Sequence, residues 1–371
     1  MNKPFWGRWG APALPLLLLG LAGCGGSDVE LASLDCAPGA GITPYCGFEN
    51  PEDIAPADDW LIISEMEGPQ DGGPEHGMLV AWHPETQLRR NLWPAEDHDE
   101  HIGSAECTRP ETINAHGLDV RPGDRRKRYR LAAINHRETR DTIEFFEVDV
   151  RGDEPEALYQ GCINVPPTDF VNDVVFLGED GDLAATRMFE FGSSAFGLIF
   201  SGLLLAQDTG YVLLWRPGEG WSELPGTDGI QPNGITADPT GEYIYVNYYW
   251  ERRTHRYRVD GGEEQEQLVF SEDDNLDNIT WAPDGTLLIA SHPGGVEAFV
   301  SCATVVGRNC LWTSRIDRVD PETMQLLGRW EHTGEPFGLA TVATQIGDSI
   351  WLGSFRGDRI ARISAEELAS R

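Results

Sequence analysis

A short pattern that recurs along the chain limits the possible folds more than any other feature of the sequence. Each copy has a polar pair, a short run rich in β-branched residues, a turn containing proline, aspartate or glycine, and a second apolar segment. The pattern is clearest when Asn233–Gly241 is aligned with Asp277–Gly285, and the apolar segments Tyr243–Tyr248 and Thr286–Ser291 follow these copies. Short apolar runs separated by tight turns predict β-hairpins in both places.

Further copies of this pattern begin at His116 and Asn172, and weaker copies begin at Glu52 and Phe337. Neighbouring copies start 44 to 64 residues apart, a period typical of a β-propeller, in which each unit is one radial sheet. One unit cannot bury both faces of its sheet, so the units pack around a common axis. Six copies predict an all-β, six-bladed β-propeller over residues 47–371, although the two weak copies leave five or seven blades open.

The first residue of each copy is expected at one end of the central channel, because equivalent strands of a propeller start at the same level. Pairs such as Asn-Gly are also ordinary turn dipeptides, and an acidic pair means little in a chain with 61 acidic residues. Turns would not require acidic or amide residues at one shared blade position, so we interpret the set as a site. Its six members face one another across the channel: Glu52, His116, Asn172, Asn233, Asp277 and Phe337.

Carboxylate and amide oxygens dominate this ring, which favours a hard cation with six to eight ligands, such as Ca²⁺. One residue further along, two copies carry Asp53 and Asp173. Together with a backbone carbonyl such as that of Leu118, they are expected to bind a second, buried Ca²⁺. The central Ca²⁺ is expected to have five side-chain ligands: Glu52, Asn172, Asn233, Asp277 and Asn278.

The first 23 residues have the features of an export signal. Lys3 and Arg8 precede an apolar run, residues 11–22, that is too short and too interrupted by proline to cross a bilayer as a helix. The run ends in Leu21-Ala22-Gly23-Cys24, which resembles a bacterial lipobox; the alternative is an ordinary secretory signal. We expect lipidation of Cys24, a tether over residues 24–46, and a protein anchored in the bacterial cell envelope that faces the periplasm or the exterior.

Six cysteines remain after Cys24, and an even number in an exported chain indicates disulfides. Six thiols allow about 15 complete pairings. The short spacings favour Cys36–Cys46 and Cys302–Cys310 and leave Cys107–Cys162 by elimination. None of these cysteines has the Cys-x-x-Cys spacing of a zinc site. The formal charge of −33 repels phosphate backbones, so we expect no nucleic-acid partner, and we expect a monomer.

Three histidines are candidates for proton transfer. His136 and His292 end predicted strands, so both are expected near the channel mouth that His116 faces. The alternative is that each is an ordinary half-exposed side chain at the end of a strand. The sequence has no Gly-x-Ser-x-Gly, His-Glu-x-x-His or glycine-rich phosphate motif, which argues against a serine hydrolase, a zinc peptidase or a nucleotide enzyme.

From about Gly47 to Phe299, the chain resembles the calcium-dependent paraoxonase/arylesterase family, whose relatives include the gluconolactonase-like propellers. The resemblance covers about two-thirds of the chain and implies a six-bladed propeller with one catalytic and one structural Ca²⁺, bound by the two residue sets given above. It depends on short motifs in the family's order: Glu52-Asp53, Asn114-Ala115-His116-Gly117, Ile134-Asn135-His136, Asn172-Asp173, Pro232-Asn233-Gly234-Ile235, Leu276-Asp277-Asn278-Ile279 and His292-Pro293.

The resemblance also implies an activity and roles for the histidines. His116 and His136 match a proposed histidine pair, and His292 matches another histidine of the pocket. A small ester or lactone is then the expected substrate of a calcium-dependent hydrolase of lactones and/or aryl esters, in which Ca²⁺ polarises the carbonyl and a histidine activates water.

One departure from the family is that no cysteine follows Cys310, so the family's disulfide between the N-terminal region and a C-terminal cysteine is absent or replaced. Two alternative functions stay open, because a fold does not determine a function. The first is a non-catalytic, calcium-stabilised propeller that binds envelope partners. The second is a related propeller enzyme, either a sugar lactonase or a strictosidine-synthase-like lyase.

Overall fold

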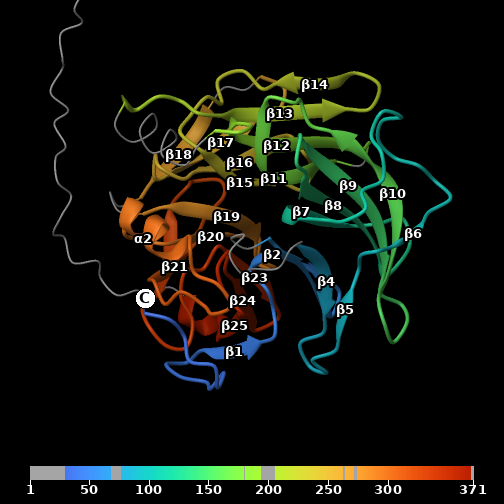
Figure 1. Ribbon diagram of the computed structural model, residues 1–371. Coiled ribbons are helices and arrows are strands. Elements are labelled where there is room, and N and C mark those ends of the chain that lie inside the picture. The colour runs from blue at the N-terminus through green and yellow to red at the C-terminus, as the bar shows by residue number, and fades with distance from the viewer. Residues whose placement is uncertain are drawn as a thin grey trace, which may run out of the picture.

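The computed structural model describes residues 30–368 apart from 68–76, 179, 194–204, 262–263 and 271–273. Its strands form six sheets arranged around one axis, as Figure 1 shows. Each sheet is one blade, so the expected six-bladed β-propeller is confirmed. Within these residues, no helix is long and apolar enough to cross a membrane. The expected signal segment and Cys24 lie outside the described residues, so export and lipidation stay predictions.

The first three blades follow one another along the chain. The first blade consists of β2 (Pro51–Ala57), β3 (Trp60–Glu65), β4 (Met78–Trp82) and β5 (Arg89–Asn91). The second consists of β7 (Ala115–Pro122), β8 (Arg128–His136), β9 (Asp141–Asp149) and β10 (Glu156–Asn164), with β6 (Glu96–Asp97) parallel to β10 at its outer edge. The third consists of β11 (Asp169–Leu177), β12 (Asp182–Glu190), β13 (Tyr211–Arg216) and β14 (Gly220–Glu223).

The remaining blades complete the ring. The fourth consists of β15 (Pro232–Ala237), β16 (Tyr243–Tyr248), β17 (Arg253–Arg258) and β18 (Glu264–Val269). The fifth consists of β19 (Leu276–Trp281), β20 (Leu287–Ser291), β21 (Ser314–Val319) and β22 (Leu326–His332), with helix α2 (Gly295–Cys302) between β20 and β21. The sixth consists of β23 (Val342–Ile346), β24 (Ser349–Gly353), β25 (Arg359–Ser364) and β1 (Thr43–Cys46), and the 3-10 helix η2 (Ala365–Leu368) follows β25.

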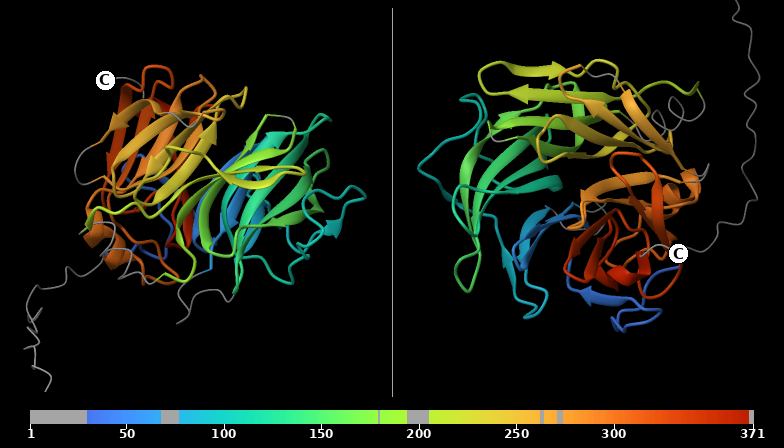
Figure 2. Two further views of the ribbon diagram at one scale, coloured as in Figure 1. Left: turned by 90° about the horizontal axis from the view of Figure 1, so that it is seen from above. Right: turned by 180° about the vertical axis from the view of Figure 1, so that it is seen from behind.

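The first strand of each blade lies at the axis, where β2, β7, β11, β15, β19 and β23 each contact the next strand around the ring (Figure 2). Six clusters of buried apolar side chains fill the spaces between neighbouring blades. Between the sixth and first blades, for example, Ile63 shares a cluster with Trp351 and Ile360. Burial on both faces explains why a strand such as β20 is apolar along most of its length rather than at alternate positions.

The sixth blade joins the two ends of the described chain. β1 pairs with β25 in antiparallel register, with Thr43 opposite Arg362. Just before β1, the side chain of Ile42 is buried in the cluster between the fifth and sixth blades, and Arg359 donates a 2.6 Å hydrogen bond from Nη2 to the carbonyl of Ser33. Within the expected tether over residues 24–46, the described part packs on the propeller: residues 43–46 form β1 of the sixth blade, and Leu31 pairs with Cys310 in the segment before β21 of the fifth blade.

The three expected disulfides are confirmed as Cys36–Cys46, Cys107–Cys162 and Cys302–Cys310. The first closes the loop that leads into β1, and the last joins the end of α2 to the segment before β21. The second ties the long connection between β6 and β7 to β10 across 55 residues of sequence. These bonds therefore hold loops onto the blades rather than blades onto one another.

Candidate active site

The starts of five inner strands bring polar side chains to one end of the channel. Glu52 of β2, His116 of β7 and Asp277 of β19 share this level with Asn172 of β11 and Asn233 of β15, and each is at most 8% exposed. Glu52 accepts a 3.0 Å hydrogen bond at Oε1 from Nδ2 of Asn278. The same oxygen lies 3.7 Å from Nε2 of His116.

The residue at the sixth position of this ring differs from the one that the repeat predicts. Phe337 is fully buried in the apolar cluster between the fifth and sixth blades, and the inner strand of the sixth blade begins only at Val342. Thr341 occupies the corresponding level. Its hydroxyl donates a 2.6 Å hydrogen bond to the backbone carbonyl of Glu52, and its own backbone carbonyl accepts a 2.9 Å hydrogen bond from the backbone amide of Asn278. The prediction for Phe337 was therefore wrong, because an apolar side chain gains more from packing between blades than from a polar channel.

Four buried oxygen atoms at this level have no hydrogen-bond donor among the described residues: Glu52 Oε2, Asn172 Oδ1, Asn233 Oδ1 and Asn278 Oδ1. Buried acceptors without a partner are costly and uncommon. The amide nitrogens of Asn172 and Asn278 contact Met188 and Glu52, which leaves their oxygens for another ligand. The described part of the chain contains no group of three His, Cys, Asp or Glu side chains arranged for a metal. Carboxylate and amide oxygens without sulfur are the kind of ligands that suit a hard cation such as Ca²⁺.

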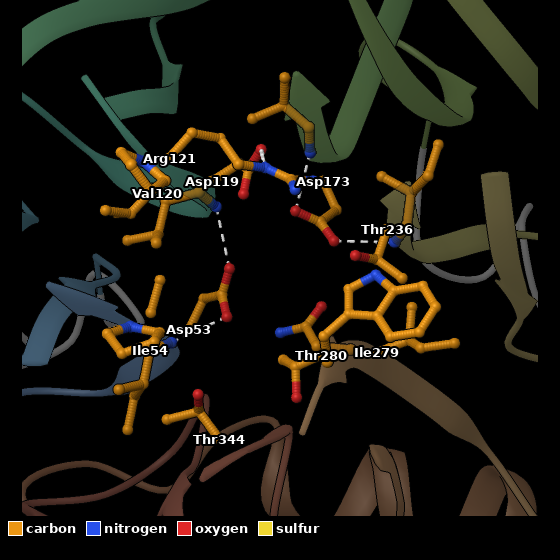
Figure 3. A pocket seen from close by; sticks show the side chains of 18 residues that line it. Asp53, Ile54, Asp119, Val120, Arg121, Asp173, Thr236, Ile279, Thr280 and Thr344 are labelled. Carbon is orange, nitrogen blue, oxygen red and sulfur yellow. Dashed lines mark hydrogen bonds and ion pairs between the residues drawn. The ribbon is translucent and has the colours of Figure 1, made fainter. Parts of the chain in front are cut away.

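Asp53 and Asp173 form a second acidic pair one residue along from Glu52 and Asn172. Figure 3 shows both carboxyl groups pointing into an opening between strands of different blades, and the cavity there measures about 220 Å³. Burial, and next the charge of Glu52, raise the pKa of Asp53 to about 8. Burial, and next the charge of Asp53, raise the pKa of Asp173 well above its usual range. Two such carboxylates side by side need a nearby cation to stay charged at neutral pH.

Backbone amides of the next blade hold these two carboxylates in place. Asp53 Oδ2 accepts a 2.9 Å hydrogen bond from the Leu118 amide, and Asp173 Oδ2 accepts a 2.8 Å bond from the Ile235 amide. The residue before Leu118 is Gly117, where a Cβ atom would lie 2.5 Å from Asn172 O and Asp173 Oδ1. Glycine is therefore required here for the inner strands to approach closely enough to form the acidic pair.

His116 and His136 are in direct contact, as the sequence predicted for two histidines at the channel mouth. Nδ1 of His116 lies 2.7 Å from Nε2 of His136, and Nδ1 of His136 lies 2.9 Å from Oδ1 of Asp141. Burial lowers the pKa of His116, but Glu52, then Asp277 and Asp141, act in the opposite direction and the result is a raised pKa. Sequence reasoning missed Asp141; the available signal was its place five residues after His136, across the β8–β9 hairpin.

His292 follows β20 and is fully buried, rather than half-exposed at the mouth. Its Nε2 lies 2.9 Å from Oδ2 of Asp277, and its Nδ1 lies 3.3 Å from the hydroxyl of Tyr249. Burial raises the pKa of Asp277, and the contact with His292 offsets part of this effect. His292 therefore supports a candidate ligand from behind and holds its orientation. Tyr249 was also missed, because nothing in the repeat pattern marks it.

Parts of this chain resemble known proteins. A model of the family described as Arylesterase matches residues 98–356. Human serum paraoxonase/arylesterase 1 is 24% identical over 196 residues, and the alignment spans 51% of this chain and 51% of that protein. The chain thus spans about half the length of this curated relative.

Solved structures with the same overall shape are more distant in sequence. A putative gluconolactonase is 16% identical, with a TM-score of 0.50 over 90% of this chain and 93% of its own. A luciferin-regenerating enzyme is 11% identical, with a TM-score of 0.50 over 88% and 97% of the two chains. At these identities the likeness concerns the fold alone.

Proposed function

Because this chain belongs to the arylesterase family, we propose that it is a calcium-dependent hydrolase of lactones and/or aryl esters. The observation that carries the proposal is the set of buried oxygens without donors around Glu52, directly beside the paired histidines. The oxygens are suited to a hard cation and the imidazoles to proton transfer, and both are needed to attack a carbonyl with water.

Two groups of residues would hold the cations. The catalytic Ca²⁺ would be bound by the side chains at the channel end, and it would polarise the substrate carbonyl and stabilise the negative charge that develops on its oxygen. The structural ion would be bound by Asp53, Asp173 and the Leu118 carbonyl. Its charge would balance the two adjacent carboxylates, which are buried too deeply to be hydrated. The ligands of the catalytic ion would be Glu52, Asn172, Asn233, Asp277 and Asn278.

The residues of the chain then carry out the proton transfers. His116 Nε2 accepts a proton from water, whose oxygen forms a bond to the carbonyl carbon; the ester C–O bond breaks, and the leaving oxygen takes up the proton. His136 orients His116 through their 2.7 Å contact. His292 keeps Asp277 in place. Since His116 is only 8% exposed, little bulk water competes for its ring.

A substrate panel combined with metal analysis tests this proposal. Purified protein is assayed on lactones, aryl esters and phosphotriesters before and after chelation, and its metal content is measured. We expect bound calcium, hydrolysis of lactones or aryl esters, and loss of activity on chelation that added Ca²⁺ restores. A non-catalytic propeller would bind calcium but hydrolyse none of the panel, and a lyase would process other substrates. Zinc in the site would contradict the proposal.

The variant His116→Gln separates chemistry from folding. Loss of a general base lowers kcat by about 10²–10⁴-fold, whereas calcium binding and the melting temperature should stay close to those of the parent. His332→Gln is the matched control, because His332 lies at the end of β22, the outer strand of its blade, where its Nε2 faces two backbone carbonyls of a nearby turn and its ring stacks on Trp330. Full activity in His116→Gln would refute the role of this histidine.

A further inference from the structure

Asp141 makes a contact that the reaction above does not use. It is fully buried at the start of β9, directly opposite His136 in the register of the β8–β9 hairpin. One carboxylate oxygen, Oδ1, faces His136 Nδ1 at 2.9 Å, and the other, Oδ2, accepts a 2.9 Å hydrogen bond from the Val171 amide. Both oxygens therefore have a fixed partner, and the carboxylate cannot turn.

The ring of His136 is fixed from a second direction by the same neighbouring strand. Phe170 of β11 stacks on the His136 ring, with the centroids 4.3 Å apart and the planes 11° from parallel. Phe170 is adjacent to Val171, whose amide holds Asp141. One short segment of the third blade therefore positions both the carboxylate and the imidazole of the second blade.

The order of contacts determines which nitrogen of each histidine carries a proton. A carboxylate can only accept, so His136 Nδ1 must be protonated and its Nε2 is then an acceptor in the neutral ring. That acceptor faces His116 Nδ1, which must therefore be the protonated nitrogen of His116. The remaining nitrogen, His116 Nε2, lies 3.7 Å from Oε1 of Glu52. This distance is longer than a hydrogen bond, so Nε2 is not required to donate and keeps its lone pair in the neutral ring.

We propose that Asp141 is a positioning residue that fixes both histidines as Nδ1–H tautomers and so leaves His116 Nε2 able to accept a proton from water. Asp141 acts only through His136 and touches no substrate. Its effect on activity rests on the proposed hydrolase function, but its effect on the tautomers does not.

The variant Asp141→Asn gives a specific expectation, because asparagine has a single acceptor oxygen. The Val171 amide must face that oxygen, since an amide nitrogen there would set donor against donor. The NH₂ group then faces His136 Nδ1 and donates to it, which moves the proton of His136 to Nε2. This reverses the chain of contacts, so His116 Nε2 becomes protonated and cannot act as a base. We expect kcat to fall by about 10²–10⁴-fold with KM unchanged.

The variant Asp141→Ala distinguishes positioning from a purely structural role. Alanine removes the partner of His136 Nδ1 without supplying a donor, so both tautomers stay accessible and kcat should fall less than in the asparagine variant. A structural role predicts the opposite order, because asparagine preserves the shape of aspartate and alanine leaves a cavity. Glu144→Gln is the matched control: Glu144 is equally buried on β9, but its side chain contacts Asn135, Arg137, Thr142 and Tyr159 rather than either histidine.

The experiment uses the full chain loaded with Ca²⁺, with ¹⁵N-labelled histidine, and reads the tautomers of His116 and His136 by NMR beside kcat and KM. Protonated Nδ1 in both rings of the parent and protonated Nε2 in Asp141→Asn support the proposal, even if the parent hydrolyses no substrate of the panel. Three results would overturn the proposal. The first is a protonated Nε2 in either histidine of the parent, and the second is that Asp141→Asn leaves the tautomers unchanged. The third is greater activity in the asparagine variant than in the alanine variant. Glu144→Gln should keep the parent's tautomers.

Discussion

Removing Ca²⁺ should make the stability of this protein fall as the pH rises. The site holds three carboxylates that are nearly inaccessible to water: Glu52, Asp53 and Asp173 are 2%, 4% and 4% exposed. Without a cation, burial and then the charge of Glu52 raise the pKa of Asp53 to about 8. The folded chain then prefers a protonated Asp53, whereas the unfolded chain has no such preference.

The size of the effect follows from the two pKa values of Asp53. In the unfolded chain this pKa is close to the ordinary 3.8. Between about pH 4 and pH 8 the folded calcium-free chain retains a proton on Asp53 that the unfolded chain has released. The contribution of this proton to the free energy of unfolding is therefore complete below about pH 4 and is lost as the pH approaches 8. The loss is about 1.4 kcal/mol per pH unit, or roughly 5 kcal/mol across the window. That is comparable with the whole stability of many domains, about 5–15 kcal/mol.

Bound Ca²⁺ should reverse this dependence, because a cation stabilises the charged form of each carboxylate and lowers its pKa. The calcium-loaded chain should then gain stability as the pH rises from about 4 toward neutrality. The difference in melting temperature between loaded and calcium-free protein should therefore be small near pH 5 and large near pH 8.

Scanning calorimetry on loaded and calcium-free protein at several pH values measures this difference. Asp53→Asn should weaken the pH dependence of the calcium-free protein, because it removes one of the buried carboxylates whose pKa is raised. Asp317→Asn is the matched control, since Asp317 is a fully buried carboxylate whose pKa burial also raises but which is paired with Arg329. Its response to calcium should equal that of the parent. A calcium-free protein whose melting temperature stays constant or rises between about pH 5 and pH 8 would refute the reasoning.

Two further changes have consequences for stability. Replacing Cys107 and Cys162 by serine opens a loop of 55 residues and should lower the free energy of unfolding by about 4 kcal/mol, measured by urea denaturation under oxidising conditions. The control is a double serine variant of Cys36 and Cys46, whose shorter loop of 10 residues should cost less; no loss in the first variant would contradict the expectation. Gly117→Ala should cost about 1–3 kcal/mol and weaken calcium binding measured by titration calorimetry, because the new Cβ would lie 2.5 Å from atoms of the next inner strand. Gly261→Ala, at an open position, should change neither quantity.

The sequence was informative where the repeat imposed one register on several blades. Glu52, Asn172, Asn233 and Asp277 could be predicted together, because one alignment places all of them within the first four residues of an inner strand. The same argument failed for Phe337, since its copy shares only the apolar pattern and its strand begins five residues later. A weak copy therefore predicts that a blade exists more reliably than it predicts the level of a given residue.

Other residues of the site carry no mark of the repeat. Asp141 reaches His136 across a hairpin, and Tyr249 reaches His292 from the neighbouring blade. Such contacts depend on the geometry of one turn or one pair of blades, which the period of the pattern does not specify. The pairing of β1 with β25 was missed for a related reason: its two strands are more than 300 residues apart, and neither is distinctive in sequence.

This late pairing has a consequence for how the molecule is made. During synthesis, Thr43–Cys46 emerges among the earliest described residues, yet its partner Arg359–Ser364 is among the last. Until then an unpaired strand edge is exposed and can add to the sheet of another molecule. Contacts so distant in sequence also form slowly. A nascent or truncated chain lacking its final strand would therefore be the form most prone to aggregate, and a chaperone that shields this edge would act at the last step of assembly.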